Sequence, residues 1–210
     1  MFELEPRSTA LVVVDMQNDF VRAGAPLEVP DARATIPANQ RLLTWFRSAG
    51  RPVVFTKFIA GPERTLMWNW SPMIAPPTCC CWPGVARSYD DARGELECTA
   101  VVDELAPLLD EPQLEKYGYS AFHRTALTDV LRARAVDTIV VTGTVTQICV
   151  EDTARGAFHE GFQTVVVSDA VSSFDPELHR ATLRNIEMKF GRVLTTDQLL
   201  AELEGRRGAP

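Results

Sequence analysis

The sequence predicts an α/β fold: a doubly wound, mainly parallel six-stranded sheet with helices on both faces. Short continuous runs of apolar, β-branched residues recur along the chain, which is typical of strands buried on both faces of a parallel sheet. Stretches with apolar residues at helical spacing separate these runs. Strands and helices therefore alternate, and this alternation favours a parallel sheet covered on both sides.

Four apolar runs are the clearest strand candidates, and two weaker segments are expected to complete the sheet. The clear runs are residues 10–14, 52–56, 138–142 and 164–168, and the weaker segments are Gln113–Lys116 and Arg192–Leu194. The stretches expected to form helices are residues 39–48, 126–134, 148–159 and 176–188, with a short final helix opened by Thr195 and Thr196. The length of 210 residues suits one domain, so we expect residues 1–210 to form a single unit.

Residues 61–91 differ in character from the rest of the chain. The segment is rich in Pro and Trp and shows little periodicity. A long irregular segment inside a compact domain is usually functional, although it could equally serve as a contact between subunits. Its apolar content leads us to expect a homo-oligomer, either a dimer or a tetramer.

Composition and charge argue against some classes of function. Hydrophobic residues make up 46% of the chain, and the net charge of −7 argues against a nucleic-acid partner, because phosphate binding needs a clustered basic surface. No apolar run approaches the roughly 20 residues of a membrane span. The five cysteines show no paired spacing, so we expect free thiols and a cytoplasmic location rather than a disulfide framework.

Three chemically useful side chains fall where predicted strands end. Asp15 follows the first strand directly, Lys116 ends a weak strand, and Cys149 comes shortly after the run at 138–142. In a doubly wound sheet these ends meet at one edge, where ligands bind. A carboxylate, an amine and a thiol on one edge predict a nucleophilic site.

The chemistry of such a cluster is coherent. A free thiol has a pKa of about 8.5. A helix that begins at Cys149 and the positive charge of Lys116 are both expected to favour the thiolate. Asp15 can take the thiol proton and return it to a leaving nitrogen. Backbone N–H groups within residues 143–147 can stabilise a tetrahedral oxyanion.

Three motifs resemble those of the isochorismatase-like cysteine hydrolases. They are residues 14–20 (VDMQNDF), 116–122 (KYGYSAF) and 143–150 (GTVTQICV), in the order and spacing of that family. The resemblance implies a catalytic triad of Asp15, Lys116 and Cys149 that forms a thioester intermediate. It also implies an oxyanion hole made by the N–H groups of Val145 and Cys149, and a cis peptide bond between Thr144 and Val145.

The sequence departs from two branches of this family. Nicotinamidases carry a metal-binding Asp-x-His after the second strand, whereas residues 55–60 read FTKFIA, and His123, His159 and His179 are scattered. We therefore expect no metal and no cofactor. True isochorismatases lack the nucleophilic cysteine, so Cys149 favours cleavage of a small amide or ureide of the N-carbamoyl, biuret or ureidoacrylate type. A streptothricin-type lactam hydrolase, a nicotinamidase-like amidase and a non-catalytic binding protein on the same fold remain alternatives.

Residues near these motifs are the candidates for binding the small-molecule substrate. Aromatic side chains would wall the pocket, while amide and hydroxyl groups would bind a carbamoyl group or cap helices. The candidates are Gln17, Phe20, Trp68, Trp70, Trp82, Tyr119, Phe122, Thr144, Thr146 and Gln147. For the run Cys79-Cys80-Cys81, packing of small apolar groups is favoured over a metal or redox site.

Overall fold

The computed structural model describes residues 2–206, and its centre is a six-stranded sheet whose neighbouring strands are all parallel. The strands are β1 (Thr9–Val14), β2 (Val53–Phe58), β5 (Gln113–Lys116), β6 (Thr138–Thr144), β7 (Gln163–Ser172) and β8 (Arg192–Leu194). Their order across the sheet is β5-β2-β1-β6-β7-β8. The predicted fold class is confirmed, including the two weak strands at β5 and β8.

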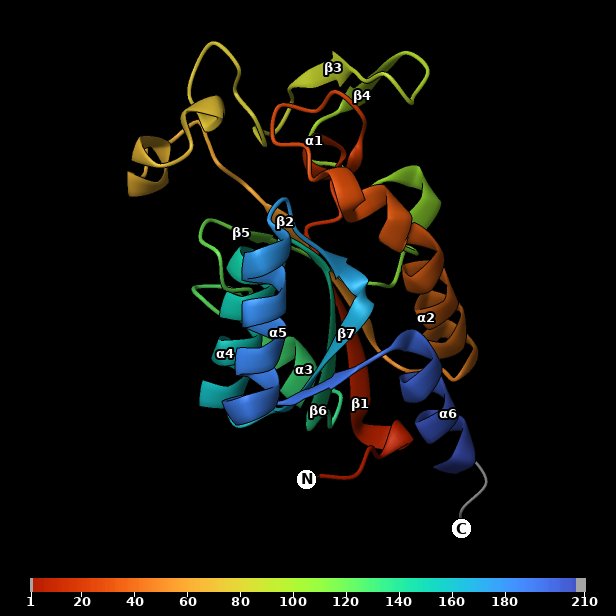
Figure 1. Ribbon diagram of the computed structural model, residues 1–210. Coiled ribbons are helices and arrows are strands. Elements are labelled where there is room, and N and C mark those ends of the chain that lie inside the picture. The colour runs from red at the N-terminus through yellow and green to blue at the C-terminus, as the bar shows by residue number, and fades with distance from the viewer. Residues whose placement is uncertain (1, 207–210) are drawn as a thin grey trace.

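Helices cover both faces of this sheet (Figure 1). One face carries α2 (Ile36–Ser48) and α6 (Thr196–Arg206), and the other carries α3 (Leu127–Arg132), α4 (Glu151–His159) and α5 (Pro176–Lys189). Alternate side chains of β1 divide between the two cores: Leu11 and Val13 pack with α2, whereas Ala10 and Val12 pack with α3 and α4. Burial on both faces explains why β1 is a continuous apolar run.

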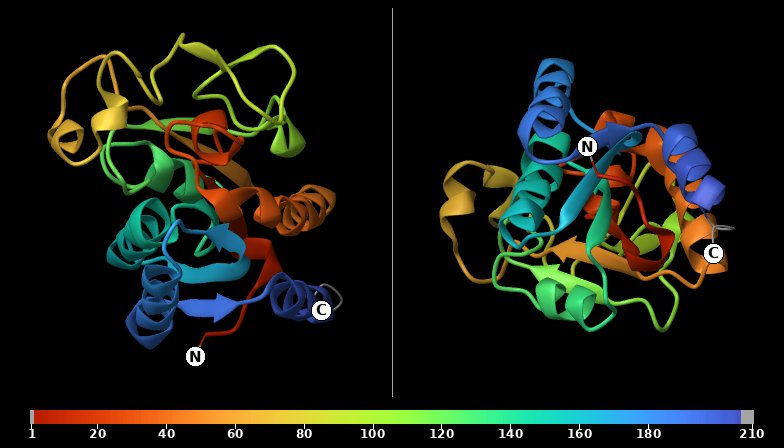
Figure 2. Two further views of the ribbon diagram at one scale, coloured as in Figure 1. Left: turned by 45° about the horizontal axis from the view of Figure 1, so that its top comes forward. Right: turned by 90° about the horizontal axis from the view of Figure 1, so that it is seen from below.

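The irregular parts of the chain gather beyond the carboxyl ends of the strands (Figures 1 and 2). Short regular elements interrupt them: α1 (Asn18–Val21) and a small antiparallel pair, β3 (Ala86–Ser88) and β4 (Glu95–Glu97). Within residues 61–91, short 3-10 turns form at Leu66–Asn69 and Pro72–Ile74. This arrangement places the segment over the edge where a ligand is expected. Among residues 2–206, no helix has both the length and the apolar character that crossing a bilayer requires.

The start of one helix differs from the sequence prediction. We expected a helix from residue 148, with Cys149 near its beginning, but α4 begins at Glu151. A π-helical turn, Thr146–Val150, precedes it, and Cys149 lies inside that turn. Such turns are short and leave little signal in the periodicity of a sequence.

Gly143 brings β6 unusually close to the end of β1. It has a φ of 103°, and a Cβ atom built there would lie 2.0 Å from the carbonyl oxygen of Val14. The register of β6 against β7 also shifts between Val141 and Gly143. A residue without a side chain is therefore required beside Asp15, which follows Val14 directly.

Replacing Gly143 with Ala is expected to lower the free energy of unfolding by at least about 3 kcal/mol, since the methyl group meets backbone and the φ is unfavourable. Gly205 is the matched control: it lies in α6, and a Cβ there has no heavy atom within 4 Å. Gly205→Ala should leave stability unchanged or slightly raised. Urea denaturation measures both, and equal stabilities of the two variants would contradict the account.

Candidate active site

Asp15, Lys116 and Cys149 come together beyond the carboxyl ends of three strands. Asp15 follows β1, Lys116 is the last residue of β5, and Cys149 lies in the turn after β6. Asp15 and Lys116 are completely buried, and Cys149 is 4% exposed. Because β2 lies between β5 and β1, the long Lys116 side chain crosses over it, with Nζ 5.1 Å from the centre of the Phe58 ring.

The Lys116 ammonium is the centre of this cluster. Its Nζ lies 2.7 Å from Asp15 Oδ2 and donates to Cys149 Sγ at 3.3 Å and to the Gly118 carbonyl oxygen at 3.1 Å. Two of its N–H donors therefore form hydrogen bonds, and the Asp15 carboxylate supplies the opposite charge of an ion pair. The charge is therefore fully satisfied within the protein, which burial requires.

Thr56 fixes the other side of the Asp15 carboxylate. The Thr56 hydroxyl donates to Asp15 Oδ1 at 2.7 Å and accepts the Asp15 backbone N–H at 3.3 Å. Each carboxylate oxygen thus has its own partner, Thr56 on Oδ1 and Lys116 on Oδ2. Sequence reasoning missed Thr56, although a polar residue after the apolar run at 52–55 was an available signal.

The surroundings of Cys149 favour its protonated form. Burial raises the pKa of Cys149 to about 12; Lys116 opposes this effect, and the charge of Asp15 and a hydrogen bond to it reinforce it. Burial lowers the pKa of Lys116, but Asp15 and Cys149 outweigh burial and the net direction is upward. The direction of this shift is opposite to the one that would favour the thiolate, because desolvation is the largest effect on the thiol.

A cavity of about 310 Å³ opens onto Cys149. Its walls are mostly apolar and come from the π-helical turn, the end of β2 and the loops above the sheet. The lining residues are Phe20, Pro26, Leu27, Glu28, Val29, Phe58, Met67, Ser71, Ile74, Tyr119, Val145, Ile148, Cys149 and Phe174. The peptide bond between Thr144 and Val145, at the edge of this cavity, is cis.

Two of the predicted aromatic residues, Phe20 and Tyr119, line the cavity directly. Trp68 and Trp82 pack against each other with ring centres 5.7 Å apart, and Trp82 Nε1 donates to the carbonyl oxygen of Ile74 at 2.8 Å. Since Ile74 is part of the wall, Trp82 supports the cavity from behind. Trp70 is 83% exposed and does not line the cavity.

Two of the predicted polar residues, Gln17 and Thr146, form hydrogen bonds with backbone groups. Gln17 accepts the Phe58 N–H at 2.7 Å and donates to the Phe58 carbonyl oxygen at 3.1 Å, so its amide ties the residues after β1 to β2. The Thr146 hydroxyl donates to the Ser172 carbonyl oxygen at 2.9 Å. The predicted aromatic residue Phe122 likewise lies away from the cavity and packs on Phe162 in the core between the sheet and helices α3, α4 and α5. None of these side chains lines the cavity.

Thr144 and Gln147 have buried polar atoms without partners among the described residues. These atoms are the Thr144 hydroxyl oxygen and both amide atoms of Gln147. Neither residue lines the cavity, although Thr144 precedes Val145 and Gln147 precedes Ile148, and both Val145 and Ile148 line it. They remain predicted substrate contacts rather than observed ones.

Glu28 is a wall residue that sequence reasoning missed. Its Oε1 lies 2.7 Å from Arg33, and its Oε2 accepts the Gly24 N–H at 2.9 Å. The hydrogen bond from Arg33 is the main cause that lowers the pKa of Glu28. Met67, Ile74 and Phe174 were missed as well, because their positions depend on how irregular segments fold over the sheet.

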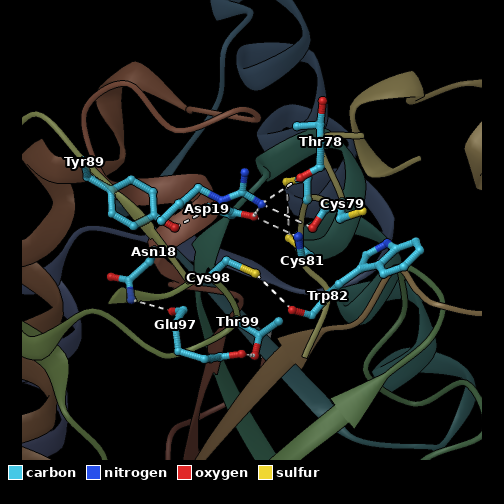
Figure 3. A network of polar contacts seen from close by, with 12 residues as sticks. Asn18, Asp19, Thr78, Cys79, Cys81, Trp82, Tyr89, Glu97, Cys98 and Thr99 are labelled. Carbon is cyan, nitrogen blue, oxygen red and sulfur yellow. Dashed lines mark hydrogen bonds and ion pairs between the residues drawn. The ribbon is translucent and has the colours of Figure 1, made fainter. Parts of the chain in front are cut away.

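The cysteine run packs around Asp19 (Figure 3). The Asp19 carboxylate pairs with Arg87 Nε at 2.9 Å, accepts the Tyr89 hydroxyl at 2.7 Å and accepts the Cys81 N–H at 2.8 Å. The potential ligand atoms of Asp19, Cys80 and Cys81 lie within 4.8 Å of one another. This geometry alone could accommodate a metal ion.

The chemistry of these groups fits packing better than metal ligation. Arg87 already neutralises the Asp19 carboxylate. The Tyr89 hydroxyl and the Cys81 N–H donate to the same carboxylate, so both of its oxygens already have protein partners. The network instead anchors residues 79–89 to α1.

Comparisons with known proteins agree with one another. The sequence model of the isochorismatase domain matches residues 9–198. A ureidoacrylate amidohydrolase, RutB, from Methylobacterium radiotolerans is 35% identical, and the alignment covers 99% of this chain and 82% of the relative. A second RutB, from Agrobacterium fabrum, is 32% identical over 92% of this chain and 89% of the relative.

Solved structures are also similar. A cysteine hydrolase from Pseudomonas syringae pv. phaseolicola superposes with a TM-score of 0.86 at 30% identity, covering 98% of this chain and 97% of that one. An N-carbamoylsarcosine amidase from Thermoplasma acidophilum superposes with a TM-score of 0.71 at 30% identity, covering 90% and 97%.

The raised thiol pKa predicts how the site titrates. Thiolates absorb near 240 nm, so the difference spectrum between the native protein and Cys149→Ser should show no thiolate band between about pH 6 and 9. The band should appear only as the pH rises toward the pKa of about 12. A thiolate band from Cys149 at neutral pH would contradict the burial argument.

Proposed function

The chain belongs to the isochorismatase domain family, and we propose that it is a cysteine amidohydrolase that cleaves the C–N bond of a small amide or ureide. The observation that carries this proposal is the contact of Cys149 Sγ with Lys116 Nζ, which is in turn paired with Asp15, at the wall of an apolar cavity. The candidate substrates are compounds of the N-carbamoyl, biuret and ureidoacrylate types.

The first half of the reaction makes a thioester. Asp15 accepts the Cys149 proton as the sulfur attacks the carbonyl carbon, so the thiol needs no separate ionisation at neutral pH. Lys116 donates to the sulfur and stabilises the negative charge that develops there. The C–N bond then breaks, and Asp15 returns the proton to the leaving nitrogen.

The second half regenerates the thiol. Asp15 takes a proton from a water molecule that attacks the thioester carbonyl, and the proton then passes to the departing sulfur. Asp15 changes role between acid and base, while Lys116 keeps its charge throughout. The chain's own groups supply both nucleophile and proton transfers, so the mechanism invokes no metal and no cofactor.

The N–H groups of Val145 and Cys149 are the proposed oxyanion hole. Both residues line the cavity at the π-helical turn. Backbone donors directed at the developing oxyanion stabilise the tetrahedral intermediate without reorganising at the moment of reaction.

We also propose a homo-oligomer in the cytoplasm, built from one domain per chain. Leu66 is 79% and Trp70 83% exposed, and both lie in the segment over the cavity, where a second copy could cover them. The five cysteines are free thiols, which suits a reducing compartment. A sedimenting species of 23.3 kDa at micromolar concentration would contradict the oligomer.

Cys149→Ala should abolish hydrolysis with the fold intact, because the nucleophile is lost. Asp15→Asn should lower kcat/KM by at least about a thousandfold, since both proton transfers depend on the carboxylate. The assay is release of ammonia or amine from a panel of primary amides and ureides, with circular dichroism to confirm folding.

Two outcomes would count against this assignment. Normal turnover by folded Cys149→Ala would remove the thiol from the mechanism, and a loss below about tenfold in Asp15→Asn would remove the carboxylate from the base role. A strong chelator in the same assay should leave the rate unchanged. Loss of activity restored by added metal would contradict metal independence.

A further inference from the structure

The cavity walls have a chemical character that selects among amides and ureides. Eleven of the fourteen lining residues are aliphatic, aromatic, methionine or proline, and the others are Glu28, Ser71 and Cys149. A surface of this kind stabilises an apolar group removed from water. A substrate with a hydrocarbon or aryl substituent fits it.

A substrate carboxylate would find no free cation at this site. Of the described residues that line the cavity, none is Lys, Arg or His. Lys116 lies next to the thiol, but its ammonium already contacts Asp15, Cys149 and Gly118. Transfer of a carboxylate from water into such a pocket is unfavourable without a paired charge.

Among the described residues that line the cavity, Glu28 alone carries a carboxyl group. Arg33 lies 2.7 Å from it, and Arg33 Nη1 donates a hydrogen bond to the Val21 carbonyl oxygen at 2.8 Å. Glu28 lines the cavity and Arg33 does not, so Glu28 is the member of this ion pair that lies on the cavity side. A carboxylate accepts hydrogen bonds from N–H groups and repels another carboxylate.

We propose that the substrate is an uncharged amide or ureide with an apolar substituent, and that Glu28 is a specificity-determining residue that disfavours carboxylate-bearing substrates. This inference rests on the proposed amidohydrolase function and narrows its substrate class. It separates this chain from the relatives named for ureidoacrylate, a compound that itself contains a carboxylate. Those relatives are 30–35% identical to this chain, a level at which pocket walls can differ.

The test compares matched ureides: 3-ureidopropanoate, its methyl ester and butylurea. The wild-type enzyme should favour the two uncharged compounds by at least about tenfold in kcat/KM. A series of alkylureas should gain about threefold per added methylene until the cavity is filled. Cys149→Ala supplies the background rate for every compound.

Glu28→Gln should reduce the preference for uncharged over carboxylate-bearing ureides by at least about fivefold. Glu104→Gln is the matched control, because Glu104 also pairs with an arginine, Arg22 at 2.8 Å, and does not line the cavity. It should leave the preference unchanged. Thermal denaturation of both variants shows whether losing the ion pair with Arg33 or with Arg22 has affected folding.

The outcomes separate this inference from the function on which it rests. If the wild-type enzyme favours 3-ureidopropanoate in a Cys149-dependent reaction, the substrate class is overturned while the amidohydrolase function stands. If a folded Glu28→Gln variant keeps the full preference, the role of Glu28 is overturned. If the amide and ureide panel gives no rate above the Cys149→Ala background, the proposed function itself fails.

Discussion

The site depends on one buried ion pair. Lys116 and Asp15 are completely removed from water and lie 2.7 Å apart. Burying two charges is costly unless each is paired and hydrogen-bonded, and here Gly118, Cys149 and Thr56 supply the remaining partners. Loss of one member would leave an uncompensated charge in the interior. The ammonium that pairs with Asp15 also holds the Cys149 sulfur in place, whereas burial is the main cause that favours the protonated thiol.

The fold supports this pair through contacts between strand ends. Gly143 lets β6 approach the end of β1, and Gln17 ties the residues after β1 to Phe58 of β2, whose ring lies beside Lys116 Nζ. Above them, the Asp19 carboxylate accepts the Cys81 N–H and so holds the segment around Cys81 in place. The next residue, Trp82, donates to the carbonyl oxygen of Ile74, which is part of the cavity wall. Stability and site geometry thus share the same contacts at the carboxyl edge of the sheet.

The sequence predicted the sheet well because its strands are buried on both faces and appear as apolar runs. It also predicted that Asp15, Lys116 and Cys149 would lie together at one edge of the sheet, where the structure places them. It did not predict the thiol pKa, because the depth of burial of Cys149 depends on the assembled fold. Gln17 was predicted to bind substrate, yet its amide bonds backbone, and sequence alone cannot distinguish these partners. The walls from Met67 and Phe174 depend on loop packing, which leaves no periodic signal.

The central claim is that Cys149 carries the acyl or carbamoyl group during turnover. The most direct test is rapid acid quench of a single turnover, followed by intact-protein mass spectrometry and peptide mapping. We expect an added mass equal to that group, located on Cys149, removed by hydroxylamine and absent from Cys149→Ala. Turnover without any covalent adduct, or an adduct on a different residue, would contradict it.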